Sequence, residues 1–270
     1  MIQEYNLNLN KKTLKDLNYD ETKISWTSSL ISKFLRHESL LFENRFITSI
    51  YRPFTKQKAY NGEGLIHRLG QSKDFFPTPE HKNLVICVSG IGVTKDFSCI
   101  ITDVIPDLEL IGKSQCFPLY WYKENKNLQK TLFDEGHEDK YIRHDGITDW
   151  ILKEVRSRFG NTRILTKEHI FYYIYGLLHS TQYKERFASD LKKSLPRIPI
   201  VDTVEDFMAF YQAGKKLADL HLNYEYITAY SGVNIVYITP LKQESHVDDE
   251  TGEVVDKLGT FEDYFVEKMR

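Results

Sequence analysis

Two carboxylates and a lysine follow a proline in the middle of the chain, in an order that could support metal-dependent hydrolysis of phosphodiesters. The group is Pro106-Asp107 with Glu109 and Lys113. Such chemistry needs two carboxylates that converge on a metal ion from adjacent strands. The spacing here is wrong, because Glu109 stands two residues after Asp107 and Lys113 four residues after Glu109. The pattern therefore favours a charged turn or strand edge over a catalytic centre.

A glycine pair follows an apolar run, as in a dinucleotide-binding loop. Gly90-Ile91-Gly92 has the first two glycines of that motif, but Lys95 stands where the third would be. The segment that follows resembles a strand, so no helix N-terminus is available for a pyrophosphate. We therefore predict a tight turn or bulge and no cofactor.

Acidic and histidine side chains near the C-terminus could in principle hold a divalent cation. His246, Asp248, Asp249 and Glu250 lack the alternating ligands and closing glutamate of a calcium loop, and a polar hairpin tip has the same composition. His179 and His221 lie near helix ends, where capping or core roles are common. No nucleophile elbow or Walker loop is present. We expect neither catalytic nor metal-binding residues in this chain.

Basic side chains interleaved with aromatic residues are the best candidates for binding. Such side chains contact phosphates, and Arg, Lys, Asn and Gln also recognise base edges. A solvated charged face is the alternative explanation, because 38 acidic residues balance 36 basic ones. The candidate contacts are Arg52, Lys56, Lys58, Arg68, Lys73, Lys95, Lys192, Lys193 and Arg197. Lys82 lies in the same region as Arg68, Lys73 and Lys95 but is not one of these candidates.

Composition places the chain among soluble globular proteins. It has 270 residues with 41% hydrophobic and 27% charged content, and a net charge of −2 argues against an all-over basic coat. No apolar run approaches the roughly 20 residues that span a bilayer. The polar N-terminal residues are not typical of a signal peptide. Cys87, Cys99 and Cys116 lie among apolar residues, so we expect reduced thiols in a cytoplasmic protein.

Three amphipathic helices are predicted between Thr166 and Glu225. Thr166 is a candidate N-cap of the first, and Tyr183, Phe187 and Leu191 form the apolar face of the second. Asp202 with Glu205 forms a capping box for the third. Ala213, Gly214 and Ala218 are small enough for a neighbouring element to approach closely.

Strands are predicted before this helical block and again after it. We expect a polar, loosely held segment up to Tyr19 and a loop over Lys123–Asp139. Further helices are predicted over Thr22–His37, Glu38–Phe46 and Ile147–Phe159. Extended segments are predicted over Ile47–Tyr60, Asn83–Gly90, Asp96–Leu110 and Gln115–Tyr122, with a C-terminal hairpin formed by Val233–Gln243 and Gly252–Leu258. The fold class is α+β, a twisted and mostly antiparallel sheet that includes the hairpin and packs with a block of amphipathic helices.

Several of these segments together resemble the C-terminal region of type ISP restriction–modification enzymes. The resemblance runs from about Ile24 nearly to the end and is most specific in the helical block. It is carried by KISWTSSLISKFL, SIYRPFTKQKAY, QCFPLYWY, IFYYIYGLLHSTQYKERFASDLKKSLPRIP and GKKLADLHLNYE.

The resemblance implies a target recognition domain over residues 47–270, after an N-terminal helical linker segment over residues 1–46. In this family a single chain joins a nuclease, a helicase-like ATPase, a coupler, an N6-adenine methyltransferase and the recognition domain. The implied partners are double-stranded DNA and those modules, with no membrane. Family members continue past the position of Arg270, so we expect a final strand or subdomain outside this chain.

Departures from the family's catalytic modules limit what the chain can do. It has no nuclease pattern, no Walker loop, no cofactor-binding glycine motif and no Asn-Pro-Pro-Tyr-type loop. We therefore expect no enzymatic activity from it alone. The alternative to DNA recognition is a scaffold module that docks on the methyltransferase and makes little contact with DNA.

Overall fold

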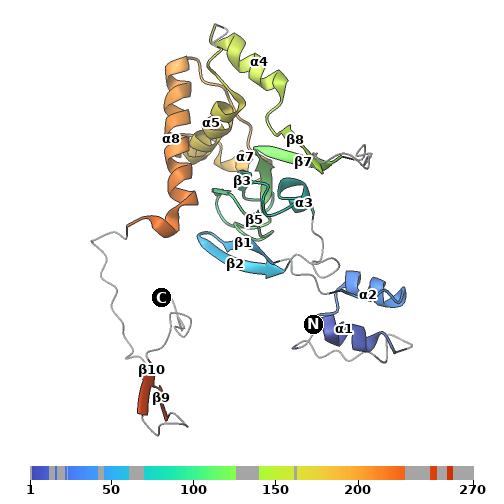
Figure 1. The fold of residues 1–270 in the computed structure, drawn as a ribbon. Helices are drawn as coiled ribbons and strands as arrows, with labels where there is room; N and C mark the ends of the chain where they lie inside the picture. Colours follow the sequence, from blue (N-terminus) through green and yellow to red (C-terminus); the bar gives the residue numbers. More distant parts are fainter. Residues whose placement is uncertain are drawn as a thin grey trace, which may run out of the picture. The chain divides into compact units, whose positions relative to one another are not determined.

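The computed structural model describes residues 2–11, 16, 22, 24–41, 46–60, 70–125, 140–160 and 163–228, and the backbone of 244–247 and 254–257. Two compact units cover residues 1–226 and 227–270. The first unit combines helices with antiparallel strands, which confirms the α+β class (Figure 1). A domain boundary at residue 46 stays a prediction.

The N-terminal residues form two helices, α1 (Ile2–Asn8) and α2 (Ser28–Leu35). The expectation of a loosely held segment up to Tyr19 is wrong for α1, because Tyr5 is fully buried and donates a hydrogen bond to the Glu38 carbonyl. Thr27 caps α2 by accepting from the Leu30 N–H, so this helix begins later than predicted. Residues 38–41 are not helical, and 42–45 lie outside the described residues.

The strands form several small sheets in place of the single sheet that the sequence predicted. β3 is the central strand of one sheet, and its four residues are all buried. Ile86 and Val88 pack with the helices, whereas Val85 and Cys87 pack with Phe75 and its neighbours on the other face. The sheets are β2-β1-β5 (Thr55–Tyr60, Phe46–Arg52, Ile105–Pro106), β4-β3-β6 (Cys99–Thr102, Val85–Val88, Gln115–Pro118) and β7-β8 (Tyr120–Glu124, Tyr141–Asp145).

The stretch Gln115–Tyr122, predicted as one strand, contributes to two sheets. Residues 115–118 pair with β3 and residues 120–124 pair with β8. Leu119 lies between them and is buried against the helices. There a Cβ on Gly146 would lie 2.0 Å from the Pro118 carbonyl oxygen, so only glycine fits the start of the segment after β8. The strand β8 itself was not predicted.

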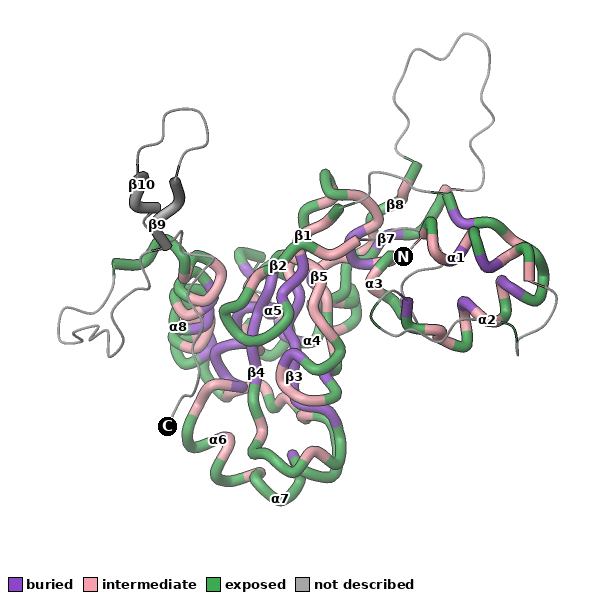
Figure 2. Tube along the Cα trace, turned by 90° about the horizontal axis from the view of Figure 1, so that it is seen from below, coloured by how far each residue is buried: buried purple, intermediate pink, exposed green. Residues whose placement is uncertain are grey.

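The helical block packs on the β3 sheet, and Figure 2 shows its buried residues gathered between the layers. Its elements are α4 (Asp149–Arg158), α5 (Lys167–His179), α6 (Thr181–Arg186), α7 (Ala188–Leu191), α8 (Val204–Leu222) and the 3₁₀ turn η2 (Tyr224–Tyr226); the short helix α3 (Ser72–Phe75) lies outside the block. The predicted second helix is divided at Phe187 into α6 and α7.

Both long helices begin at threonine caps. Thr166 accepts from the His169 N–H, as predicted. The cap of α8 is Thr203, which accepts from the Asp206 N–H, so the capping box predicted one residue earlier is wrong. Asp202 instead forms an ion pair with Arg158 of α4.

The axes of α5 and α8 approach closely at two glycines. A Cβ on Gly214 would lie 2.0 Å from the Tyr172 carbonyl oxygen, and one on Gly176 would lie 2.2 Å from the Phe210 carbonyl oxygen. Gly214 and Ala218 are buried in this contact, as predicted, whereas Ala213 is exposed to solvent.

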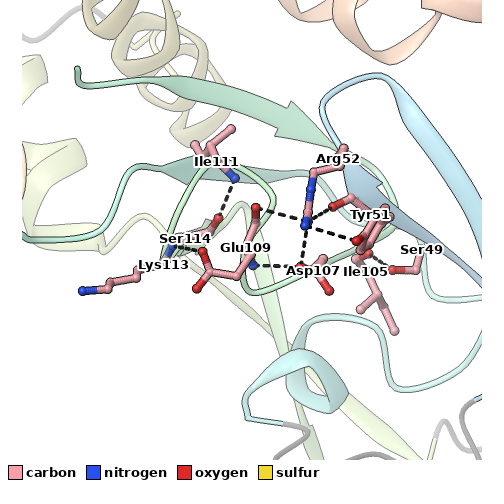
Figure 3. Close-up of polar contacts among 9 residues, drawn as sticks. All are labelled: Ser49, Tyr51, Arg52, Ile105, Asp107, Glu109, Ile111, Lys113 and Ser114. Atoms are coloured by element: carbon pink, nitrogen blue, oxygen red, sulfur yellow. Dashed lines mark hydrogen bonds and ion pairs between the residues drawn. The ribbon is translucent and has the colours of Figure 1, made fainter. Parts of the chain in front are cut away.

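Two motifs considered for chemistry are turns. A Cβ on Gly90 would meet the Lys113 carbonyl oxygen at 2.2 Å, and Gly92 has a φ of 74°, so the pair forms a tight turn. Asp107 Oδ1 accepts from the Glu109 N–H, and Glu109 Oε2 accepts from the Lys113 N–H (Figure 3). These carboxylates stabilise a charged turn, as the sequence predicted.

The second unit contains an antiparallel pair, β9 (Glu244–Val247) and β10 (Val254–Lys257), bonded to each other. The hairpin is thus a sheet of its own, and its first strand begins after the predicted Val233–Gln243 stretch, which lies outside the described residues. The acidic tip at 248–250 also lies outside them. In the part of the chain that the structure describes, no helix is long and apolar enough to cross a bilayer.

Candidate nucleic-acid interface

A groove of about 760 Å³ opens between the β1–β2 hairpin, the segment after α3, the β4–β5 turn and the start of β8. Figure 1 shows these elements in blue to green, with β8 next to α4 and the β1–β2 hairpin near the lower end of α8. Its polar wall carries three lysines, Lys58, Lys82 and Lys140. The remaining lining includes Phe46, Thr48, Phe76, Pro77, Thr78, Pro79, His81, Asp103, Val104, Ile105 and Tyr141.

The three groove lysines keep their ammonium groups available to a ligand. Lys58 Nζ makes one hydrogen bond, to Thr48 Oγ1 at 3.3 Å, and Lys82 is exposed. Lys140 pairs with Glu124 at 3.2 Å, which raises the Lys140 pKa. Exposed ion pairs of this kind are worth about 0 to 1 kcal/mol, so a phosphate can displace Glu124 at little cost. The groove therefore presents three cations at a mixed polar and aromatic surface.

Aromatic contacts join His81 and Tyr141, two residues that line the groove. The His81 ring lies edge-on to Tyr122 and Tyr141, with centroids 4.8 and 5.4 Å apart, and its Nδ1 is 2.7 Å from Thr78 Oγ1. These contacts fix the segment that carries Lys82 against the β7–β8 hairpin, whose first β8 residue follows Lys140. Two of the three lysines thus stand on mutually packed elements.

The β7–β8 hairpin also presents a stacked aromatic pair, on the face opposite the groove residue Tyr141. Trp121 lies opposite His144 with ring centroids 4.2 Å apart, and Trp121 remains 38% exposed. On the other face, the Arg143 guanidinium lies 4.4 Å from the Tyr120 ring. Exposed aromatic and guanidinium planes offer stacking surfaces to bases.

Two of the predicted contact residues interact with other residues of the protein. Arg52 donates to the Tyr51 and Glu109 carbonyl oxygens and to Asp107 Oδ1, at 2.9, 3.4 and 3.5 Å (Figure 3). Lys56 pairs with Glu225 at 3.1 Å and is 21% exposed. Burial lowers the Lys56 pKa, but the hydrogen bond to Glu225 and the charges of Asp103 and Glu225 together outweigh burial and raise this pKa. Lys58 is the member of this stretch that faces the groove.

The other predicted residues fall into separate places. Lys192 pairs with Asp96 at 3.4 Å, and its carbonyl accepts from the Gly92 N–H, so the 90–96 loop lies against the end of α7. Lys95 and Lys193 are exposed in this second basic region, which Figure 2 shows at the far end of the body from β1 and β2.

Three more predicted residues belong to neither basic region. Arg197 borders a separate cavity of about 410 Å³ between α6, α7 and the Pro199 segment. Lys73 is exposed on α3, and Arg68 lies outside the described residues. The DNA-binding role of all nine predicted residues stays a prediction.

Sequence reasoning missed Lys140 and did not select Lys82. Lys140 directly follows the predicted loop over Lys123–Asp139 and directly precedes β8, a strand that was not predicted. The alternation of Tyr141, Arg143 and Asp145 with Ile142 and His144 is the signal that could have revealed the strand. Among the described residues, no three His, Cys, Asp or Glu side chains gather into a metal-binding group.

A family model described as the type ISP C-terminal specificity domain matches residues 1–270. The chain belongs to this family. It is a recognition module of a type ISP enzyme rather than a catalytic one. No curated protein matches the chain.

Solved structures of larger enzymes resemble this specificity domain. It is 35% identical to the ATP-dependent type ISP restriction–modification enzyme LlaBIII bound to DNA, covering 86% of this chain and 14% of that one with a TM-score of 0.72. A DrdV–DNA complex is 31% identical to this chain. The match covers 85% of this chain and 21% of the DrdV chain, with a TM-score of 0.73. A nuclease-deletion mutant of the type ISP restriction–modification enzyme LlaGI, in complex with a DNA substrate mimic, is 31% identical to this chain. The match covers 86% of this chain and 20% of the LlaGI chain, with a TM-score of 0.69. The domain thus spans about a fifth or less of each relative.

Proposed function

We propose that this specificity domain recognises a short sequence in double-stranded DNA and so selects where other modules of its parent enzyme methylate adenine at N6 and cleave. The observation that carries the proposal is the groove with Lys58, Lys82 and Lys140 on its wall. Lysines on the rim of a groove contact phosphates and fix register, while neighbouring side chains discriminate bases. The similar structures are DNA complexes, which supports the proposal.

The domain itself contributes no chemistry in this proposal. Asp107 and Glu109 stabilise a turn, and methylation and cleavage belong to the methyltransferase, nuclease and helicase-like modules. The setting for such an enzyme is the cytoplasm, where the bacterial chromosome and incoming phage DNA are both accessible.

The second candidate function is docking on the methyltransferase with little DNA contact. Two observations favour it: the net charge is −2, and carboxylates already engage Arg52, Lys56, Lys192 and the groove residue Lys140. The groove lysines favour DNA recognition, because nothing in a docking role requires three cations around one cavity.

Salt-dependent binding to a random duplex pool, followed by sequencing of the retained DNA, tests the proposal. We expect enrichment of a short motif and a negative slope of log affinity against log salt. Each lysine that neutralises a phosphate contributes about 0.9 to that slope. Single variants Lys58→Ala, Lys82→Ala and Lys140→Ala should each flatten it by about this amount.

The matched control is Lys216→Ala, which removes an exposed lysine of α8 outside the groove. It should leave both the slope and the motif unchanged. Absence of enrichment and of a salt slope in the wild-type domain would refute DNA recognition and leave the docking function. An equal effect of Lys216→Ala would refute the groove as the contact surface.

A further inference from the structure

The tip of the β1–β2 hairpin is fastened to the end of α8. Phe54 occupies the turn with a φ of 58°, a region that bulky side chains rarely adopt. Its ring lies edge-on to His221 and Tyr224, with centroids 5.3 and 5.2 Å apart. A strained aromatic residue at a hairpin tip persists where its surroundings hold it.

A second contact joins the same two elements two residues further along the hairpin. Lys56 Nζ lies 3.1 Å from Glu225 Oε2 and 5.4 Å from the centroid of the Tyr224 ring. Figure 1 shows the orange C-terminal end of α8 beside the blue hairpin. Two hairpin side chains therefore contact three residues from the end of α8 and from η2.

The His221 ring also contacts a buried residue of α5. Its Nδ1 lies 2.6 Å from the hydroxyl of Tyr175, which is fully buried on α5. The same hydroxyl oxygen accepts a hydrogen bond from the Ile101 N–H of β4 at 3.1 Å. A continuous set of contacts therefore runs from β4 through Tyr175 and His221 to Phe54.

The clamp, defined as Phe54, Lys56, His221, Tyr224 and Glu225, lies next to the groove. Thr48 and Ile50 of β1 pair with Lys58 and Lys56 of β2, so these two lysines project from the same face of the hairpin. Lys56 is held at the clamp, and Lys58 stands on the groove wall. A hairpin freed at its tip can pivot, and that motion would carry Lys58 away from Lys82 and Lys140.

We propose that Phe54 and His221 are positioning residues that hold the β1–β2 hairpin, and with it Lys58, in the register needed for phosphate contact. This rests on the proposed function, because it assigns a mechanical role at the same DNA site. Neither residue touches DNA in the proposal. Their effect on binding passes through Lys58.

A double-mutant cycle in the full chain tests the proposal. Phe54→Ala should flatten the salt slope of DNA binding by about 0.9 although it removes no charge, because Lys58 loses its phosphate. Lys58→Ala should then have little further effect in the Phe54→Ala background. Lys82→Ala should flatten the slope by the same amount in the wild-type and in the Phe54→Ala background. Phe54→Tyr keeps the ring and should bind like the wild type.

Tyr224→Leu releases the clamp from the other side and should reproduce Phe54→Ala, with circular dichroism and thermal melting to establish folding. Independent, additive effects of Phe54→Ala and Lys58→Ala, or an unchanged slope in Phe54→Ala, would overturn the positioning role while leaving DNA recognition intact. If Lys58→Ala and Lys82→Ala both leave the slope unchanged, the groove is not the contact surface and the positioning role fails with it. If the wild-type domain shows neither enrichment nor a slope, DNA recognition itself fails.

Discussion

Gly214 offers the sharpest test of how the helical block is held together, because two physical effects predict opposite signs for one substitution. In Gly214→Ala the new Cβ would lie 2.0 Å from the Tyr172 carbonyl oxygen and 2.7 Å from the Gly176 nitrogen. Both atoms belong to the α5 backbone, so no side chain can rotate away. An ordinary contact would require α5 and α8 to separate by more than about 1 Å, disturbing a close-packed core.

The expected magnitude follows from two opposing contributions. Overpacking costs about 1 to 3 kcal/mol, and a backbone-to-backbone clash belongs at the upper end of that range. Alanine is favoured over glycine inside a helix by about 1 kcal/mol, which offsets part of the cost. We expect Gly214→Ala to lower the free energy of unfolding by about 2 kcal/mol, or the melting temperature by about 4 to 8 °C.

Urea denaturation with parallel calorimetry measures this change. The matched control is Ala213→Gly on the exposed side of the same helix, which should cost about 1 kcal/mol through helix propensity alone. If Gly214→Ala instead stabilises the domain by about 1 kcal/mol, propensity governs the site and the close helix contact is wrong. A displaced α8 in Gly214→Ala should also weaken the contacts of the clamp, because His221 is a residue of α8.

Two further predictions concern buried polar groups. The Asn83 amide donates to the Phe75 and Tyr120 carbonyl oxygens and accepts from the Leu84 and Tyr120 N–H groups. Asn83→Ala should therefore lower the free energy of unfolding in urea denaturation by at least about 2 kcal/mol. Asn83→Asp should also be destabilising, because its carboxylate has no N–H to donate to these carbonyl oxygens. A cost under about 0.5 kcal/mol would contradict this bonding. Burial lowers the pKa of His179 to about 4 from 6.5, so the unfolded chain binds a proton between these pH values that the folded chain does not. The stability that comes from neutral His179 is therefore fully present above about pH 6.5 and is lost as the pH falls toward 4. The variant His179→Phe should flatten this dependence of the free energy of unfolding on pH. An unchanged pH profile in that variant would exclude His179 as the source of the dependence.

Sequence alone determined the features that depend on near neighbours along the chain. The apolar run at Val85–Val88 is a buried strand, and Thr166 caps a helix whose apolar residues face the core. The Asp107–Lys113 segment is a charged turn. Family membership also follows from the sequence, because the helical block retains its specific pattern. These features follow from propensity, periodicity and capping, which act over a few residues.

Only the tertiary structure decided which basic residues remain available for binding. Arg52 meets Asp107 across 55 positions, and Lys56 meets Glu225 across 169. Lys140 joins Lys58 at one groove because β8, a strand not predicted from the sequence, returns beside β7. No local pattern encodes such pairings, since they depend on how separate elements pack. The basic stretch around Lys58 was therefore visible in the sequence, whereas the division of its residues between clamp and groove was not.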